Sequence, residues 1–355
     1  MSLKAELRAL IARDGPLGVD AYMSLCLHHP KWGYYATCPA LGPEGDFITA
    51  PLVSQMFGEL IGLWAAEVWM RLGAPQRVLL VEVGPGDGTL MSDVLRAGRV
   101  APGFLDAAEV WLVEPSPVLR GVQRARLGDV RPLRWAPSLD ELAADAPVIL
   151  IANEVFDCLP ARQFVRQSEA WGERVVVADD GGELAFSTRP VTAPGLPDTA
   201  DAAVMEHSTE QADFARSVAQ RVLAQGGCAL LIDYGRDAPE PGDTLQALRR
   251  HQKVDPLTAP GECDLTVWAE FDVVADAARR MGAAVAGPVP QADLLGRLGV
   301  EARAAVLSRS RPHQASVIHR QLRRLTHPDD MGELFKAIAI HRPRDPVPPG
   351  FESPA

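Results

Sequence analysis

A glycine-rich turn is the first feature of this sequence that could do chemistry. The residues Glu-Val-Gly-Pro-Gly-Asp-Gly occupy positions 82–88, between an apolar run at 77–83 and an expected helix over 89–98. Glycines allow a tight turn and a close approach to a ligand, and the free N–H groups of the following helix favour a carboxylate or phosphate. The residues that we expect to contact a cofactor at this turn are Glu82, Gly84, Pro85, Gly86 and Gly88.

The spacing of the glycines bears on the kind of cofactor. A dinucleotide-binding turn has the pattern G-x-G-x-x-G, in which the third glycine lets helix and strand pack closely. Here Thr89 stands at that third position and the glycine comes one residue earlier, at Gly88. The resulting pattern E-x-G-x-G-x-G resembles motif I of class I S-adenosylmethionine (SAM) methyltransferases, in which the loop wraps the methionine portion of the cofactor. SAM is the favoured interpretation, with a dinucleotide or a purely structural turn as alternatives.

A second acidic residue supports a nucleoside ligand. Glu114 ends an expected strand over 110–116, and a carboxylate there can accept hydrogen bonds from both ribose hydroxyls. SAM and a dinucleotide both predict this residue, so Glu114 does not distinguish them. The alternative is a solvated charge at the end of a strand.

Polar residues also follow the expected strand over 147–152. Asn153, Glu154 and Asp157 come directly after this apolar run. The carboxyl ends of parallel strands are where doubly wound folds bind ligands, so we expect a functional role for all three. The alternative is a turn with a helix cap.

Composition narrows the classes of partner. The chain has 355 residues and a formal net charge of −11, which argues against non-specific binding to nucleic acid or to an anionic membrane. Five cysteines are too few for a disulfide framework, and no apolar run approaches the ~20 residues of a membrane span.

Cys26, His28, His29 and Cys38 match no common zinc spacing, so no metal is expected. The start of the chain lacks the apolar stretch of a secretory signal, so we expect a cytoplasmic protein, with the mitochondrial matrix as the alternative.

The elements that position these residues alternate between strand and helix. Expected strands lie at 77–83, 110–116, near 130–135, at 147–152 and at 228–235. Such alternation predicts an α/β, Rossmann-like fold with a doubly wound, mostly parallel sheet. Between the fourth and fifth strands, residues 161–227 predict an insertion that consists of a β-meander and a helix over 209–225.

The chain therefore divides into five expected segments. An N-terminal helical and lid segment comes first, then a cofactor-binding half, the insertion, a second half of the core and a mobile Pro-rich tail. Their bounds are 1–75, 76–160, 161–227, 228–341 and 342–355.

With these motifs assembled, the sequence resembles the MidA-like SAM-dependent methyltransferases, whose mitochondrial members are protein-arginine methyltransferases that assist assembly of respiratory complex I. The matching blocks run in order along nearly the whole chain, and two are especially specific, namely GDFIT with SQMFGE (45–59) and NEVFDCLP (153–160). Cys158 and Asp87 depart from the family pattern, and Asp87 could alter the charge near the SAM carboxylate.

The resemblance implies methyl transfer from SAM to an arginine of a protein, in the best-known case a complex I subunit. Carboxylates can hold a guanidinium by bidentate hydrogen bonds and assist proton loss, and the residues expected to do so are Glu154, Asp157 and Asp46. The loop 30–53 would be a lid, and Thr49 in it would contact SAM. The alternatives are a SAM-binding assembly factor with little catalysis, or a methyltransferase acting on a small molecule or RNA.

Overall fold

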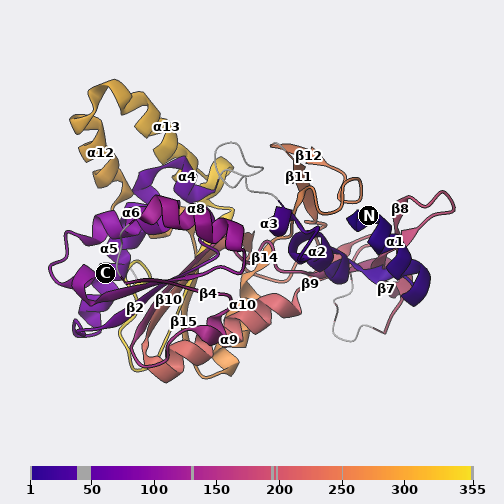
Figure 1. The fold of residues 1–355 in the computed structure, drawn as a ribbon, viewed down its shortest axis with the longest axis horizontal. Helices are drawn as coiled ribbons and strands as arrows, with labels where there is room; N and C mark the ends of the chain where they lie inside the picture. The colour runs from indigo at the N-terminus through magenta and orange to yellow at the C-terminus, as the bar shows by residue number, and fades with distance from the viewer. Residues whose placement is uncertain are drawn as a thin grey trace. The chain divides into compact units, whose positions relative to one another are not determined.

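A computed structural model describes residues 2–37, 49–128, 132–192, 196, 199–249 and 251–352 of the chain (Figure 1). The residues form two compact units, each assembled from three stretches of sequence. Unit 1 comprises Met1–Phe47, Phe156–Ala212 and Ala238–Glu270. Unit 2 comprises Ile48–Val155, Asp213–Asp237 and Phe271–Ala355. The expected α/β organisation is confirmed, and the mostly parallel sheet lies in unit 2.

The sheet of unit 2 has the strand order β15-β16-β10-β5-β2-β3-β4. The bounds are β2 Val78–Val83, β3 Ala108–Val113, β4 Leu133–Ala136, β5 Val148–Asn153, β10 Gly227–Arg236, β15 Ala284–Pro290 and β16 Phe335–His341. The pairs from β10 to β4 are parallel, whereas β16 runs antiparallel to both β10 and β15. Strands β2 and β3 are buried along their whole length, as continuous apolar runs predict.

Helices cover both faces of this sheet. In Figure 1, α5, α6 and α8 lie on one side of the sheet and α9 and α10 on the other. The bounds are α5 Gln55–Arg71, α6 Thr89–Gly98, α7 Phe104–Ala107, α8 Pro117–Leu127, α9 Thr209–Gln225, α10 Phe271–Arg280 and α11 Gln291–Arg297. Helix α5 packs closely on α6 because Gly58 and Gly62 present no side chain: a Cβ atom at Gly62 would lie 2.6 Å from the carbonyl oxygen of Val94. The doubly wound arrangement is confirmed.

Two further helices of unit 2 fall in a stretch, 299–334, for which the sequence analysis expected no element. Helices α12 (Val300–Ser310) and α13 (Ala315–Thr326) form a hairpin that packs on α5 (Figure 1). Its buried contacts are made by Met56, Ala304, Leu307 and Ile318. A short helix α4 (Ala50–Val53) lies against α13.

Unit 1 contains the expected β-meander. Strands β6 (Arg162–Gln167), β7 (Ala170–Ala178) and β8 (Leu184–Pro190) pair antiparallel in succession. Strand β9 (Val204–His207) pairs with β6. A short N-terminal strand, β1 (Leu17–Gly18), pairs with β7, so the beginning of the chain joins the insertion in one sheet.

The remaining elements of unit 1 complete its core. A second small sheet has the order β12-β11-β13, with bounds β11 Gln246–Arg249, β12 Gln252–Val254 and β13 Asp264–Thr266. The helices are α1 Leu3–Asp14, α2 Val19–His28 and α3 Tyr34–Thr37. Buried side chains from α1 and α2, such as Leu7 and Met23, pack with Val176 of β7 and Leu265 of β13. The N-terminal segment and the insertion therefore share one hydrophobic core.

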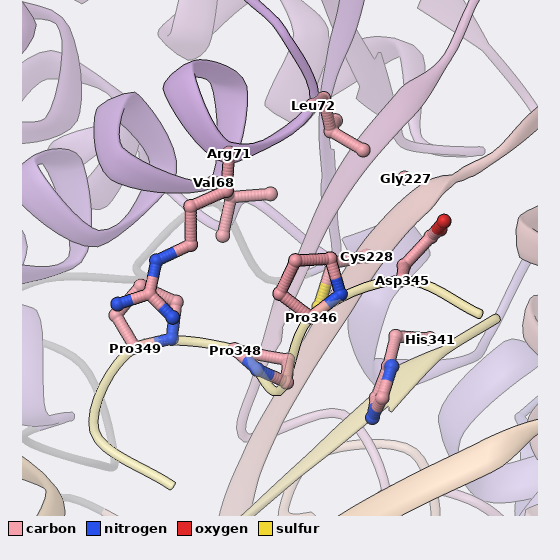
Figure 2. A pocket seen from close by; sticks show the side chains of 10 residues that line it. All are labelled: Val68, Arg71, Leu72, Gly227, Cys228, His341, Asp345, Pro346, Pro348 and Pro349. Carbon is pink, nitrogen blue, oxygen red and sulfur yellow. The ribbon is translucent and has the colours of Figure 1, made fainter. Parts of the chain in front are cut away.

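The C-terminal segment differs from the mobile tail that the sequence analysis expected. Residues 346–349 lie along α5 and help to line a small cavity with Val68, Cys228 and His341 (Figure 2). Arg71 donates to the carbonyl oxygen of Val347 and to the Glu352 carboxylate, at 2.7 and 2.6 Å. The abundant prolines keep this segment out of regular structure but do not prevent it from packing.

Within the described ranges, every helix is too short or too polar to pass through a bilayer.

Candidate functional site

The glycine turn follows β2 and leads into α6, as its sequence predicts. Gly84, Gly86 and Gly88 all have positive φ angles, of 62°, 53° and 83°. Other residues adopt such angles at a cost, which explains the three glycines. A Cβ atom at Gly84 would lie 3.0 Å from Cγ2 of Val155, so the turn touches the segment that follows β5. The turn and the end of β5 thus form one site within unit 2.

Glu82 is buried at the end of β2. Its side chain is 3% exposed, and its Oε2 atom has no hydrogen-bond partner among the described residues. Burial raises the pKa of Glu82 to about 8, and the nearby Asp87 carboxylate adds to the rise. The Glu82 carboxyl is therefore mostly neutral at pH 7 in the free protein.

Glu114 lies just beyond β3 and is tied to the glycine turn through Gln123 of α8. The Gln123 Nε2 group donates to the carbonyl oxygen of Gly86 at 2.9 Å and to Oε2 of Glu114 at 3.2 Å. The other oxygen of Glu114 accepts from the N–H of Ser116 at 2.8 Å. Burial raises the pKa of Glu114, although these two hydrogen bonds oppose the rise.

The role of Gln123 was not evident from the amino-acid sequence. Gln123 is fully buried, and its Oε1 atom accepts from the indole N–H of Trp135 at 2.9 Å. The stretch VEPSPVLRGVQ (113–123), which also resembles the MidA-like family, was its only sequence signal and carried no assigned role. The position of Gln123 in the middle of a helix gave no indication that it would bridge two strand ends.

Asp87, which departs from the family pattern, has partners within the protein. Its carboxylate accepts from the N–H of Thr89 at 2.9 Å and pairs with Arg126 of α8 at 2.7 Å. Arg126 also donates to the carbonyl oxygen of Asp87 at 2.9 Å. The Asp87 charge is thus compensated by Arg126, which reduces the change in charge that the sequence analysis expected at the turn.

Asn153 and Glu154 form the other side of the site, at the carboxyl end of β5. The Glu154 Oε1 atom accepts from Asn153 Nδ2 at 2.9 Å and from the N–H of Ala50 at 3.0 Å. Glu154 has φ 55°, an angle that costs energy for a residue with a side chain. Residues held in such a conformation cluster at functional sites, so the conformation supports a functional role for Glu154.

The contact with Ala50 gives Glu154 a structural role. Ala50 begins α4, and Thr49 stands at the N-cap position but makes no side-chain capping bond. The Glu154 carboxylate therefore satisfies a free N–H at the start of this helix. The turn-and-cap interpretation of Glu154 is thus partly correct, and Thr49 lies next to the site.

Asp157 belongs to unit 1. Its carbonyl oxygen accepts from the N–H of Val267 at 2.9 Å, and its side chain is 8% exposed. Burial raises the pKa of Tyr35 well above its usual value, and the Asp264 and Asp157 carboxylates contribute to this rise. Asp46, the third expected catalytic carboxylate, and residues 38–48 of the expected lid lie outside the described residues.

The unit 2 site fits a ligand that carries hydrogen-bond donors. Three buried side-chain oxygens around the turn have no partner among the described residues: Oε2 of Glu82, Oγ1 of Thr89 and Oδ1 of Asn153. Leaving such an atom unpaired costs about 1–3 kcal/mol, which a ligand with ammonium or hydroxyl groups would offset. SAM carries both kinds of group. Metal-holding clusters of His, Cys, Asp or Glu are absent from the described part of the chain.

Known proteins are similar to this chain along most of its length. A family model described as "Putative S-adenosyl-L-methionine-dependent methyltransferase" matches residues 60–289. The Protein arginine methyltransferase NDUFAF7 homolog, mitochondrial, of Drosophila melanogaster is 34% identical over 374 residues, which cover 96% of this chain and 84% of the relative. The Protein arginine methyltransferase NDUFAF7, mitochondrial, of Danio rerio is 33% identical over 369 residues, covering 96% and 86%.

A solved structure extends the similarity to three dimensions. It is the crystal structure of a "likely methyl transferase" from Burkholderia thailandensis bound to S-adenosyl-homocysteine, the demethylated form of SAM. The two chains are 29% identical and superpose with a TM-score of 0.86, covering 98% of this chain and 94% of the other. This similarity favours SAM over the dinucleotide that the glycine spacing had left open.

Proposed function

The chain belongs to a family of SAM-dependent methyltransferases, and from this premise we propose that it methylates an arginine guanidinium of a protein. The protein is an enzyme with SAM as its cofactor. The names of its relatives, protein arginine methyltransferases, support arginine as the target. The resemblance to MidA-like proteins suggests a respiratory complex I type subunit as the substrate.

The end of β5 carries the proposal for catalysis. SAM supplies an electrophilic methyl group on a sulfonium. Glu154 is held in a strained conformation beside the glycine turn, and its carboxylate is oriented by Asn153 and Ala50. A carboxylate fixed in this way can hold a guanidinium, localise its charge away from the attacking nitrogen and accept a proton. Holding the nucleophile in place can supply up to ~7–11 kcal/mol of the barrier.

The cofactor-binding roles follow from the same site. We propose that the glycine turn, with Pro85, holds the methionine portion of SAM, that Glu82, Asn153 and Thr49 contact the cofactor, and that Glu114 binds the ribose hydroxyls. The unpaired oxygens of Glu82 and Asn153 support this assignment. Asp157 and Asp46 remain proposed as further carboxylates for the substrate arginine.

The test separates the charge of Glu154 from its capping role. Glu154→Gln keeps an oxygen that can accept from Ala50 and Asn153 but removes the negative charge, whereas Glu154→Ala removes both. We expect the Gln variant to bind SAM with unchanged affinity by calorimetry and to lose at least 100-fold in methyl transfer. Methyl transfer is measured with SAM that carries a tritiated methyl group and with a cell extract as the source of acceptors. Protease and nuclease treatments are the controls, and amino-acid analysis identifies the methylated residue.

The outcomes discriminate among the alternatives. A Gln variant with wild-type turnover would refute the catalytic role of Glu154 and leave only its cap. Label that nuclease removes would indicate RNA, and label that is soluble in acid would indicate a small molecule. SAM binding without methyl transfer to any fraction would favour an assembly factor.

We propose the cytoplasm as the compartment, with the mitochondrial matrix as the alternative because the relatives named above are called mitochondrial. Fractionation of cells that carry a tagged chain would decide between them.

A further inference from the structure

The α12–α13 hairpin carries positive charge on a protein that is otherwise acidic. Residues 300–327 contain six arginines and a single acidic side chain, Glu301, whereas the whole chain has a formal net charge of −11. One arginine, Arg303, pairs with Glu59 of α5 at 2.7 Å and so anchors the hairpin. The other five lie on exposed positions of the hairpin: Arg309, Arg311, Arg320, Arg323 and Arg324.

Four of these five exposed arginines have no ion-pair partner among the residues that the structure describes. Arg323 lies 3.8 Å from Asp330. Arg309, Arg311, Arg320 and Arg324 form no ion pair with any other described residue. A group of uncompensated guanidinium groups on one element is a surface that favours an acidic partner.

The spacing of exposed residues along each helix of the hairpin groups arginines with valines. Arg320 and Arg324 are four residues apart on α13, so they lie on one side of the helix, and Val317 precedes Arg320 on the same side. Val306 of α12 and Val317 are exposed by 44% and 41%. Exposed valines beside unpaired arginines offer apolar contact as well as charge, a combination typical of protein-binding surfaces. We define the basic face as Val306, Arg309, Arg311, Val317, Arg320 and Arg324.

The hairpin that carries the basic face contacts α4, the helix that begins beside Glu154. Helix α13 packs against α4, and Ser54, which follows α4, lies within hydrogen-bond distance of Gln321, at 3.3 Å. The first N–H of α4, that of Ala50, is bound by Glu154. A protein held on the basic face would therefore bind the same hairpin that packs against α4.

From these observations we propose that the basic face docks an acidic segment of the protein substrate, separate from the arginine that is methylated. This inference rests on the proposed function for the nature of the partner. A duplex nucleic acid or an anionic bilayer is less favourable, because an extended polyanion would also meet the acidic remainder of the molecule. A short acidic segment meets only the hairpin, since charges more than ~8 Å away are screened at physiological salt.

The experiment uses two fluorescent peptides and the full-length protein. One peptide has a single arginine among glycines and serines, and the other adds six aspartates or glutamates on one side. Binding is measured by anisotropy at 50 and 300 mM NaCl in the presence of S-adenosyl-homocysteine. We expect the acidic extension to strengthen binding at least tenfold at low salt, and the gain to shrink at high salt.

A charge reversal with a matched control locates the effect. Arg320→Glu with Arg324→Glu should abolish the gain, whereas Arg279→Glu with Arg280→Glu, which makes the same change of charge at exposed positions of α10, should retain it. Arg320→Gln with Arg324→Gln is the milder version. Circular dichroism checks folding, and methyl transfer to the short arginine peptide should be unchanged in all variants.

Each other outcome overturns the proposal. It is wrong if the acidic extension gives no gain, if the α10 variant loses the gain equally, or if the wild-type protein binds anionic vesicles or RNA more tightly than the acidic peptide. It is also wrong if the hairpin variant alters self-association and not peptide binding, since the face would then join two copies of the chain. Failure of the wild-type enzyme to methylate arginine would instead contradict the proposed function, and the anisotropy measurement would remain a separate result.

Discussion

At the scale of single residues, Glu82 is a buried acid whose charged form is unfavourable in the free protein. It is an acid buried at the carboxyl end of β2, with one oxygen unpaired among the described residues. Its raised pKa, about 8, means that folding of the free protein takes up a proton at neutral pH. The contribution of Glu82 to stability is therefore fully present below the pKa of the unfolded chain, ~4.3, and is lost as the pH rises through the folded value.

The stability of the Glu82→Gln variant should depend on pH less steeply than that of the wild-type protein. In the absence of SAM, the wild-type protein should lose stability relative to the variant between pH 4.5 and pH 8, by at most about 1.4 kcal/mol per pH unit. Urea unfolding at several pH values measures this difference. Glu301→Gln, at an exposed position, is the control and should follow the wild-type curve. Parallel curves for wild type and Glu82→Gln would show that the buried carboxyl does not titrate as described.

Glu154 makes a structural contact in addition to its proposed catalytic role. Its carboxylate accepts a hydrogen bond from the N–H of Ala50 at the start of α4. A loss of activity in Glu154→Ala alone would therefore not identify a catalytic group. The Gln variant is informative because it keeps the hydrogen-bond geometry and changes only the charge.

At the scale of elements, the attachment of the helical hairpin depends on a network of ion pairs around one buried carboxylate. Glu59 of α5 is 6% exposed and is bound by Arg303 of α12, at 2.7 Å, and by Arg96 of α6, at 3.1 Å. Asp93 pairs with the same Arg96. Three helices are thereby joined through one carboxylate, and the small apolar cluster around Met56 completes the contact.

We expect Arg303→Ala to destabilise the protein by about 1–3 kcal/mol, because a buried carboxylate loses two charged donors. Arg280→Ala removes an exposed pair with Asp276 and should cost about 0.5 kcal/mol or less. The free energy of unfolding in urea gives both values. Equal effects of the two substitutions would indicate that the Arg303–Glu59 pair does not anchor the hairpin.

The packing of α5 on α6 belongs to the same scale. In a dinucleotide-binding turn the third glycine allows helix and strand to approach, and here that position holds Thr89. Close approach occurs elsewhere in unit 2, at Gly58 and Gly62 of α5. Gly58, which lies in the SQMFGE block of the family resemblance, therefore has a packing explanation and no direct chemical one.

At the scale of the whole molecule, the C-terminal end of the chain completes unit 2. Strand β16 lies between β15 and β10, and the segment that follows it covers Cys228 and contacts α5. Pro348 and Pro349 are buried, and Arg297 of α11 donates to the carbonyl oxygen of Gly350 at 3.0 Å.

Removal of residues 342–355 should therefore lower the stability of the folded protein. We expect a loss on the order of 2–4 kcal/mol, from uncovered apolar surface and the lost partners of Arg71. Thermal unfolding, together with the rate at which Cys228 reacts with a thiol reagent, measures the effect. Arg71→Gln in the full-length chain should give a smaller loss and leave Cys228 protected. An unchanged melting temperature after truncation would show that the segment is a loose tail, as the sequence suggested.

Much of the sheet of unit 2 was predictable from local patterns. Strands buried on both faces are continuous apolar runs, and the alternation with helices indicates parallel pairing; hence β2, β3, β5 and β10 were expected within two or three residues of their bounds. The glycine turn was equally readable because three positive φ angles require glycine. The family resemblance added the cofactor and the reaction.

The tertiary structure decided what depends on contacts between residues far apart in the sequence. No local pattern places β1 beside β7, so the N-terminal segment and the insertion were expected to be separate, although they share one core. Strand β16 was not expected because its apolar run is short, and it becomes a strand by pairing antiparallel with β10 and β15. Gln123 became a bridge between Gly86 and Glu114, and Glu154 a cap for α4, because hydrogen bonds join side chains by their distance in space, which spacing along the chain does not reveal.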